Sequence, residues 1–256
     1  MPKERVLSND QRRHYNELHD RYEDHYYDAP STAYRQRFIY DPMFCDTDLS
    51  RKKVLEIGCG SGHNADHFQS RFPDAEIHGC DISDRAVVDF QAKFGPQSCR
   101  RMDITQPLYE VAETYDVIIA VSVAHHLING LDQALANIHR LLNPGGVFIM
   151  YEPNALFMNS VRNLWYKLDK NFDDVNEEAL NYDQMKAQFL PFGFAERRVY
   201  FIGGPAFYVI LNSMILRIPK GFKRATHPFW FLVETYWNRW LPRSMKACFL
   251  AEWEKT

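Results

Sequence analysis

The sequence lacks several features that mark common protein classes. No stretch approaches the ~18 consecutive apolar residues of a membrane-spanning helix, and the opening Met-Pro-Lys-Glu-Arg begins no apolar secretory signal. The five cysteines form no Cys-x-x-Cys pair and their number is odd, so a disulfide framework is not expected. The ten histidines show no metal-type spacing. We therefore expect a globular protein of a reducing, cytoplasmic compartment, without a metal centre.

Charge is spread unevenly along the 256 residues. The formal net charge of −3 argues against a general nucleic-acid binder, so no nucleic-acid partner is expected. From Tyr200 onward Lys and Arg exceed Asp and Glu by five, so the preceding part carries −8. The length suits one α/β domain with a substantial core.

Residues 53–65 have the pattern of a buried strand, a glycine turn and a helix start. The run from Val54 to Ile57 is apolar except for Glu56, near the carboxyl end, where α/β folds place ligands. A glycine turn lets the backbone approach a ligand, and the next helix directs its free N–H groups there. The turn has three glycines at alternate positions: Gly58, Gly60 and Gly62. This differs from the dinucleotide fingerprint Gly-x-Gly-x-x-Gly, because His63 occupies the third glycine position.

A second acidic position follows about twenty residues later. Residues 76–83 have the pattern of a second strand, which ends at Asp81. A carboxylate at this place can accept hydrogen bonds from both hydroxyls of a ribose. The glycine turn and this acid together strengthen the case for a ligand at this edge.

The chain here resembles the class I S-adenosylmethionine (SAM) methyltransferases. Five segments match the family in order and spacing: residues 55–62 (Leu-Glu-Ile-Gly-Cys-Gly-Ser-Gly), Asp81, 102–104 (Met-Asp-Ile), 115–122 (Tyr-Asp-Val-Ile-Ile-Ala-Val-Ser) and 141–149 (Leu-Leu-Asn-Pro-Gly-Gly-Val-Phe-Ile). The resemblance covers about residues 50–202, with a weaker match to the end. The pattern is most similar to methyltransferases of quinone, lipid and secondary-metabolite pathways.

Alternating strands and helices predict a parallel sheet with right-handed crossovers. The strands expected after the first lie at about 75–80, 98–102, 116–121, 147–151 and 194–202. The helices expected between them lie at about 62–72, 84–94, 107–113, 130–142 and 182–191, and Val87, Val88 and Phe90 are expected to be buried. The resemblance implies an α/β, Rossmann-like, doubly wound sheet of seven strands, whose last strand at 246–253 is antiparallel.

Residues 1–45 are predicted to form an N-terminal helical lid on the core of residues 50–202. One helix is expected from Asn9 to Tyr27 and another over 31–42. The resemblance implies that such a segment folds over the cofactor. The residues expected to close the site and contact substrate are Tyr26, Tyr27, Tyr34 and Arg37. The alternative is an aromatic face packed on the core, and both interpretations stay open.

Residues 203–245 form a predicted helical insert before the last strand. Two aromatic-rich segments, 205–218 and 228–241, lie on either side of basic residues. Such faces can lie on an anionic membrane, line a lipophilic acceptor pocket, or form an oligomer contact. A cap packed on the sheet is the fourth interpretation. Peripheral contact of 205–241 with the inner face of a membrane therefore stays open. A further helix is expected over 155–168.

The resemblance implies a cofactor, SAM, and a role for each matching residue. Glu56 would anchor the ammonium group, and the three turn glycines would let the backbone pass the amino-acid part. The remaining roles are the ribose hydroxyls for Asp81, the two adenine faces for Ile82 and Ile104, the adenine amino group for Asp103, and the methionine part for Val121 and Ser122. Each glycine could instead serve only the turn, and each acid could cap a helix.

SAM carries an activated methyl group, so a methyltransferase mainly has to align the acceptor and exclude water. A histidine after the fourth strand has a suitable pKa for a general base, and His126 is the catalytic candidate. His125, Glu152 and Asn154 are substrate-binding candidates. The alternatives are a histidine that only positions groups, and loop hydrogen bonding by Glu152 and Asn154.

The segment after the fourth strand lacks two patterns of macromolecule methylation. It has neither an Asn/Asp-Pro-Pro-Tyr/Phe grip nor a Pro-Cys nucleophile. We therefore expect methyl transfer from SAM to an oxygen or nitrogen of a small acceptor, with a lipophilic one favoured by the insert. A protein or RNA methyltransferase and a catalytically silent SAM-binding scaffold remain alternatives.

Overall fold

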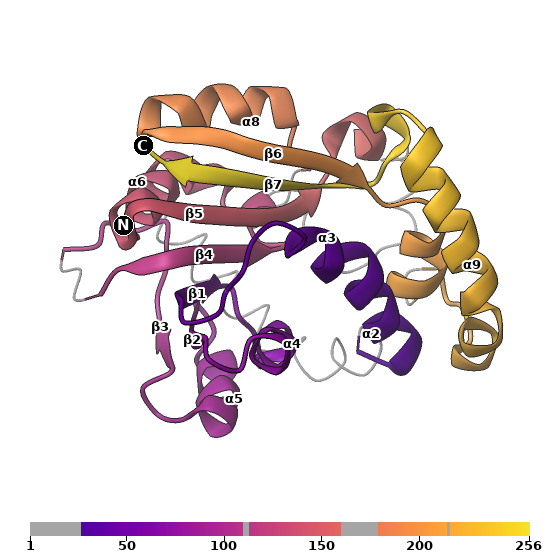
Figure 1. Cartoon of the computed structure of the whole chain (residues 1–256), viewed down its shortest axis with the longest axis horizontal. Coiled ribbons are helices and arrows are strands. Elements are labelled where there is room, and N and C mark those ends of the chain that lie inside the picture. Colours follow the sequence, from indigo (N-terminus) through magenta and orange to yellow (C-terminus); the bar gives the residue numbers. More distant parts are fainter. Residues whose placement is uncertain (1–26, 110–112, 160–178, 214–215) are drawn as a thin grey trace.

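The computed structural model describes residues 27–109, 113–159, 179–213 and 216–256, built around a seven-stranded sheet (Figure 1). The strands are β1 (Lys53–Ile57), β2 (Glu76–Asp81), β3 (Cys99–Arg101), β4 (Tyr115–Val121), β5 (Leu142–Pro153), β6 (Phe194–Ile202) and β7 (Cys248–Lys255). Their order is β3-β2-β1-β4-β5-β7-β6, and β7 is antiparallel to β5 and β6. The predicted Rossmann-like sheet with an antiparallel last strand is confirmed.

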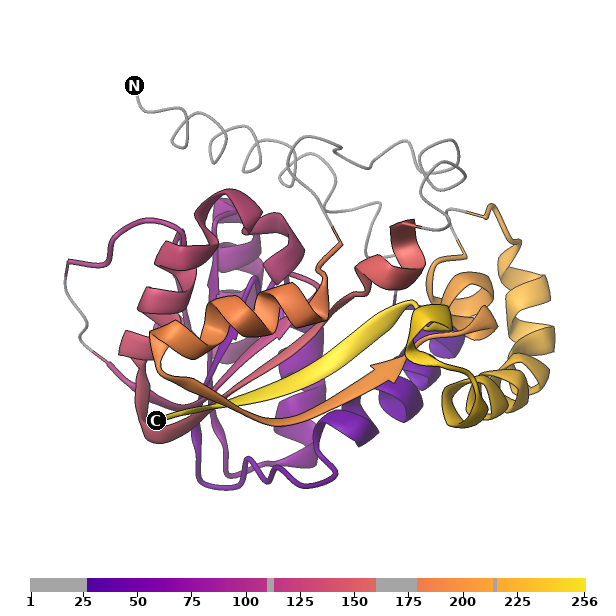
Figure 2. The ribbon, with the colours of Figure 1, turned by 90° about the horizontal axis from the view of Figure 1, so that it is seen from above.

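Helices cover both faces of this sheet (Figure 2). α4 (His63–Arg71) and α5 (Asp84–Phe94) pack on one face, and α6 (Leu131–Leu141) and α8 (Tyr182–Phe189) pack on the other. Successive strand residues alternate between the faces. Ile118 and Ile119 of β4, for example, belong to opposite hydrophobic clusters. This double burial explains why the inner strands are continuously apolar.

The N-terminal segment and the insert pack against each other. The first comprises α2 (Ala29–Arg35), the π-helical η1 (Gln36–Tyr40) and α3 (Asp41–Met43). The insert comprises the π-helical η5 (Phe207–Leu211) and α9 (Lys220–Trp240), which both contact α2. α9 lies past the carboxyl ends of β5 and β6 (Figure 1). The predicted helix over 31–42 is confirmed, whereas the one at 9–27 lies, but for residue 27, outside the described residues.

Two predictions of helix and burial are wrong. Val88 is exposed, because Ala86 and Phe90 share the buried face of α5 and Val88 points away from it. Residues 107–109 are not helical, and 110–112 lie outside the described residues. Side chains of α6 donate to backbone carbonyl oxygens, in and just before this stretch, that a helix would use for its own hydrogen bonds. Asn137 donates to the Gln106 carbonyl oxygen at 2.7 Å, and Arg140 donates to that of Leu108.

One strand extends further than predicted, and one helix of the predicted insert continues through a proline. β5 begins at Leu142, five residues before Val147, and a register shift opposite Tyr115 and Val117 accommodates the intervening turn. α9 begins at Lys220 and continues through Pro228. A proline there leaves the Arg224 carbonyl oxygen without its usual N–H partner. His227 Nδ1 lies 2.8 Å from that oxygen and replaces the missing donor. Of the predicted helix over 155–168, residues 155–159 are helical and 160–168 are not described.

Candidate functional site

The turn after β1 brings the chain close to the loop after β4. Gly58 has a φ of +64°, and a Cβ atom there would lie 2.6 Å from Cγ2 of Val123. A side chain at this position would therefore clash in addition to straining the backbone. Gly60, with a φ of +53°, has open space where its Cβ would be. The turn therefore packs against the loop after β4 at Gly58, whereas beside Gly60 there is open space.

Glu56 is a buried carboxylate at the carboxyl end of β1. Its Oε1 accepts a hydrogen bond of 2.7 Å from Asn64 Nδ2, and Asn64 Oδ1 accepts one of 2.5 Å from the Tyr40 hydroxyl. Its Oε2 is buried and accepts no hydrogen bond from the part of the chain that the structure describes. Burial raises the pKa of Glu56 to about 8. An unmatched buried carboxylate oxygen fits a cationic ligand such as the SAM ammonium group.

Arg35 of α2 is the residue that sequence reasoning missed. It is buried, its guanidinium lies 4.7 Å from the centre of the Tyr27 ring, and its positive charge lowers the pKa values of Glu56 and Tyr40. A buried cation thus stands near the buried carboxyl of Glu56. The helical period could have identified Arg35 as buried, because it lies four residues from Ser31 and from Ile39, which are both buried, and so shares their face of the helix.

The predicted lid residues separate into two groups. The Tyr27 ring stacks on His63 at 3.8 Å, immediately after the glycine turn. Tyr34 is buried instead between α2 and α9, where its hydroxyl donates to Glu234 at 2.8 Å. Arg37 is exposed and donates to Thr235 of α9 at 3.2 Å. Tyr34 and Arg37 therefore fix α9 to the N-terminal segment, while Tyr27 lies beside the glycine turn. Tyr26 lies outside the described residues.

Asp81 links the end of β2 to the glycine turn. Its Oδ2 accepts a hydrogen bond of 3.0 Å from the Gly60 amide, and its Oδ1 accepts one of 2.8 Å from the Ser83 amide. Its carboxylate is only partly buried, as is the neighbouring Ile82 side chain. Asp81 is thus held at the open part of the turn, where a ligand can reach it.

Asp103 and Ile104 follow β3. Asp103 Oδ1 accepts from the amide and the hydroxyl of Thr105, at 3.0 and 2.6 Å, which closes a tight turn. Asp103 is partly exposed, whereas Ile104 is buried in the hydrophobic core and its carbonyl oxygen accepts from Asn137 at 2.7 Å. Asp103 is therefore better placed than Ile104 for an exposed contact.

The loop after β4 is fixed by Glu152 of β5. Glu152 is fully buried and accepts from the amides of Val123, Ala124 and His125 at 2.9, 2.7 and 3.2 Å. It also accepts from His125 Nδ1 at 2.7 Å. With Nδ1 protonated, Nε2 is the nitrogen of His125 that can take up a proton. We therefore assign Glu152 to positioning the loop and His125, in place of the predicted contact with substrate.

The remaining predicted residues lie around the same loop. Val121 is buried at the end of β4, and Ser122 is exposed with a φ of +58°, in the left-handed region that non-glycine residues rarely adopt. The rings of His125 and His126 pack with their centres 3.8 Å apart. The structure thus brings Ser122 and both histidines into one loop next to Gly58.

Asn154 belongs to the scaffold. It is fully buried, and its Nδ2 donates to the carbonyl oxygens of Arg243 and Lys246 at 2.9 and 2.8 Å. Its Oδ1 accepts from the Leu156 amide at 3.2 Å. These contacts join the end of β5 to the segment before β7, and a side chain used in this way replaces the predicted substrate contact.

The described residues contain no group of three or more His, Cys, Asp or Glu side chains arranged to hold a metal ion. Within the same ranges, none of the helices combines the length and the apolar character needed to cross a bilayer.

Comparison with known proteins found similarity to a methyltransferase family and to several methyltransferases, and also to an arginine hydroxylase of Danio rerio. Residues 55–148 match the family described as a methyltransferase domain. A sterol 24-C-methyltransferase of Debaryomyces hansenii is 28% identical over 159 residues, 58% of this chain and 36% of the relative. A fatty-acid O-methyltransferase of Mycolicibacterium smegmatis is 26% identical over 112 residues, 43% of this chain and 40% of the relative. The chain thus spans well under half the length of these curated relatives.

Solved structures show the same fold. The N-methyltransferase NodS of Bradyrhizobium japonicum, in complex with S-adenosyl-L-homocysteine, superposes with a TM-score of 0.54 at 13% identity, over 93% of this chain and 98% of that chain. The chain has the Rossmann-like methyltransferase fold, and residues 55–148 are similar to the methyltransferase-domain family.

Proposed function

We propose that the protein binds SAM at the carboxyl edge of its sheet and transfers the methyl group to a small acceptor. The observation that carries this proposal is the buried Glu56 carboxyl, together with the buried Arg35 guanidinium, whose charge lowers the pKa of that carboxyl. One buried carboxylate oxygen lacks a partner among the described residues, and a buried guanidinium acts on the same carboxyl group. An amino-acid zwitterion has the complementary charges, an ammonium for Glu56 and a carboxylate for Arg35.

The other cofactor contacts follow the order of the strands. Gly58, Gly60 and Gly62 let the backbone pass the amino-acid part, and Asp81 accepts from the ribose hydroxyls. Ile82 lies against the adenine, Asp103 accepts from its amino group, and Val121 and Ser122 lie near the methionine part. Tyr27, stacked on His63 beside the turn, supports a covering role for the N-terminal segment.

The loop after β4, which carries His125 and His126, is where we propose that the methyl acceptor binds. When bound, SAM supplies a methyl group that is already activated on a sulfonium sulfur. An acceptor hydroxyl or amine must lose its proton as it gains the methyl group, and a positioned histidine can accept that proton. His125, oriented by Glu152 at 2.7 Å, is the first candidate, and the adjacent His126 is the second.

The acceptor that we propose is a small, lipophilic molecule methylated on oxygen or nitrogen. Relatives named for sterol and fatty-acid methylation support a lipophilic acceptor, although the sterol enzyme is named for carbon methylation. The aromatic insert beside α2 supports it independently, because its apolar side chains can line an acceptor site.

Methyl transfer from isotopically labelled SAM into a host-cell extract, followed by partition between organic solvent and water, tests the proposal. Label in the organic phase is expected, and Glu56→Gln should abolish it. Label in the aqueous small-molecule pool would overturn the lipophilic acceptor only. Label only in precipitated protein or RNA would overturn the small-molecule acceptor. Failure of the purified protein to bind SAM or S-adenosylhomocysteine would overturn the whole proposal.

A further inference from the structure

The outward face of α9 carries a continuous apolar stripe. Its members are 50–69% exposed: Phe222, Phe229, Leu232, Tyr236 and Trp240. At 100° per residue their positions fall within about 80° of arc along the 21 residues of the helix. Single exposed apolar residues are ordinary, but five on one helix face form a surface that needs a partner.

The opposite face of α9 is held firmly in the fold. Lys223 is fully buried, and its Nζ lies 2.7 Å from Asp28 Oδ1 and 2.5 Å from Ser31 Oγ. Glu234 is also fully buried and accepts from Tyr34, as well as from the Gly204 and Ala206 amides at 2.8 and 2.9 Å. Rotation of the helix to bury the stripe would break these buried contacts, so the stripe faces outward in the native fold.

The exposed charges of the stretch that carries the stripe have one sign. Between residues 216 and 245 the only acid is Glu234, which is buried. The exposed cations of this stretch are Arg217, Lys220, Arg224, Arg239 and Arg243, of which Arg243 pairs with Asp183. These exposed cations belong to a chain whose net charge is −3. A second copy of the chain would bring like charges together, whereas an anionic lipid surface complements them.

We propose that α9 lies in the interfacial plane of an anionic phospholipid bilayer, with its apolar stripe inserted and its basic residues near the lipid phosphates. A narrow apolar stripe beside cations is typical of such helices, and tryptophan and tyrosine favour the interface. α9 packs on α2, which carries Arg35, so this orientation places α9 between the bilayer and α2 (Figure 1). Binding to the bilayer does not depend on methyl transfer.

Vesicle co-sedimentation of the full chain tests the proposal. The protein should bind vesicles of equal phosphatidylcholine and phosphatidylglycerol, and bind phosphatidylcholine alone much more weakly. Leu232→Ser with Tyr236→Ser and Trp240→Ser should lower the partition coefficient at least about tenfold. Arg224→Gln with Arg239→Gln should lower it about fivefold per charge on the anionic vesicles only. Val88→Ser with Leu190→Ser, exposed apolar residues on other elements, is the matched control and should bind as the wild type.

Three results would overturn the proposal. The first is wild-type protein that does not sediment with anionic vesicles, and the second is a triple variant that sediments as well as wild type. The third is a wild-type dimer in light scattering that the triple variant abolishes, with no vesicle binding, which would make this face a contact between copies. Thermal unfolding and S-adenosylhomocysteine affinity of each variant should match wild type, which separates a surface effect from misfolding and from failure of the methyltransferase proposal.

Discussion

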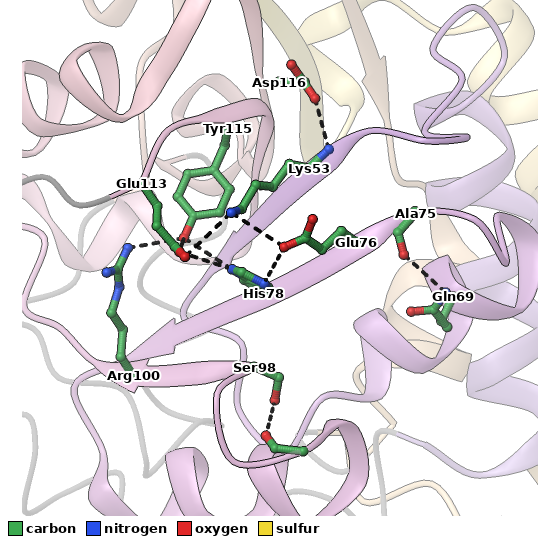
Figure 3. A network of polar contacts seen from close by, with 11 residues as sticks. Lys53, Gln69, Ala75, Glu76, His78, Ser98, Arg100, Glu113, Tyr115 and Asp116 are labelled. Atoms are coloured by element: carbon green, nitrogen blue, oxygen red, sulfur yellow. Dashed lines mark hydrogen bonds and ion pairs between the residues drawn. The ribbon is translucent and has the colours of Figure 1, made fainter.

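Charged side chains at the amino ends of the strands differ from those at the carboxyl ends in the partners that they find. Near the amino ends of β1, β2 and β4, and reaching Arg100 of β3, Figure 3 shows a network in which the groups pair with one another at 3.1–3.5 Å. Its members are Lys53, Glu76, His78, Arg100, Glu113 and Tyr115. Glu76 is exposed and Glu113 is partly exposed, so water also solvates them. Such a network contributes little free energy and leaves nothing for a ligand to satisfy.

At the carboxyl edge, two glutamates are buried and their partners differ. Glu152 accepts from three amides and one histidine, whereas Glu56 has one oxygen that accepts no hydrogen bond from the described residues. A fully matched buried carboxylate stabilises the backbone that it binds. An unmatched one carries a desolvation cost that a cationic ligand can offset. Both glutamates are buried, so burial does not distinguish them. The number of hydrogen bonds that each carboxylate accepts distinguishes Glu152, which belongs to the scaffold, from Glu56, the candidate binding residue.

The largest effect is expected from Glu152→Ala. The substitution leaves three loop amides and His125 without their acceptor, so the free energy of unfolding should fall by about 3–5 kcal/mol. Chemical denaturation at pH 7 measures it. A loss under about 1 kcal/mol would show that water replaces the carboxylate, and the contrast with Glu56 would fail.

Glu56→Gln should have the reverse profile. The neutral amide keeps the shape of the side chain but removes the charge that faces the ligand ammonium, so S-adenosylhomocysteine affinity should fall about 100-fold. The free energy of unfolding should not decrease at pH 7, because the ligand-free carboxyl, with its pKa raised to about 8, is already mostly neutral at that pH. Calorimetric titration and denaturation of the same variant give both values. Unchanged affinity would remove Glu56 from the cofactor site.

Proton release gives a sharper test of the same residue. Because burial raises the pKa of Glu56 to about 8, its carboxyl is mostly protonated at pH 6.5. A bound ammonium favours the carboxylate, so binding of S-adenosylhomocysteine at pH 6.5 should release close to one proton. Calorimetry in buffers of different ionisation enthalpy counts it, and Glu56→Gln should release none.

The same raised pKa sets the pH dependence of stability without ligand. In the unfolded chain Glu56 ionises near its ordinary pKa of 4.5, before the folded protein does. The unfolded state therefore loses its proton first, and the contribution of Glu56 to the free energy of unfolding decreases as pH rises from about 4.5 towards 8. Glu56→Gln should remove this decrease, and identical pH profiles of the two proteins would contradict the raised pKa.

The smallest effect is expected at the amino edge. Glu113→Gln removes ion pairs of 3.5 and 3.4 Å with Lys53 and His78, which are partly solvated, so the free energy of unfolding should change by less than about 0.5 kcal/mol. S-adenosylhomocysteine affinity should match wild type. This variant is the matched control for Glu56→Gln, and a loss of affinity in it would mean that charge at either edge affects binding.

The sequence by itself determined the order of strands and helices, the glycine turn and the acids that end β1 and β2. These depend on local periods and on residues within one strand–turn–helix unit, so they can be read from neighbouring positions. The helical period also distinguishes Arg35, which lies four residues from Ile39, from the exposed Arg37. The residue that we predicted was nevertheless Arg37.

Only the tertiary structure decided which polar residues are scaffold and which face a ligand. Glu152 meets its donors 27–29 positions away, and Tyr34 meets Glu234 across 200 positions. No local pattern encodes such pairings, because they arise when distant segments pack at one edge. The continuation of α9 through Pro228 has the same origin: His227 supplies a substitute donor, and buried contacts of Lys223 and Glu234 hold both sides of the proline in one helix.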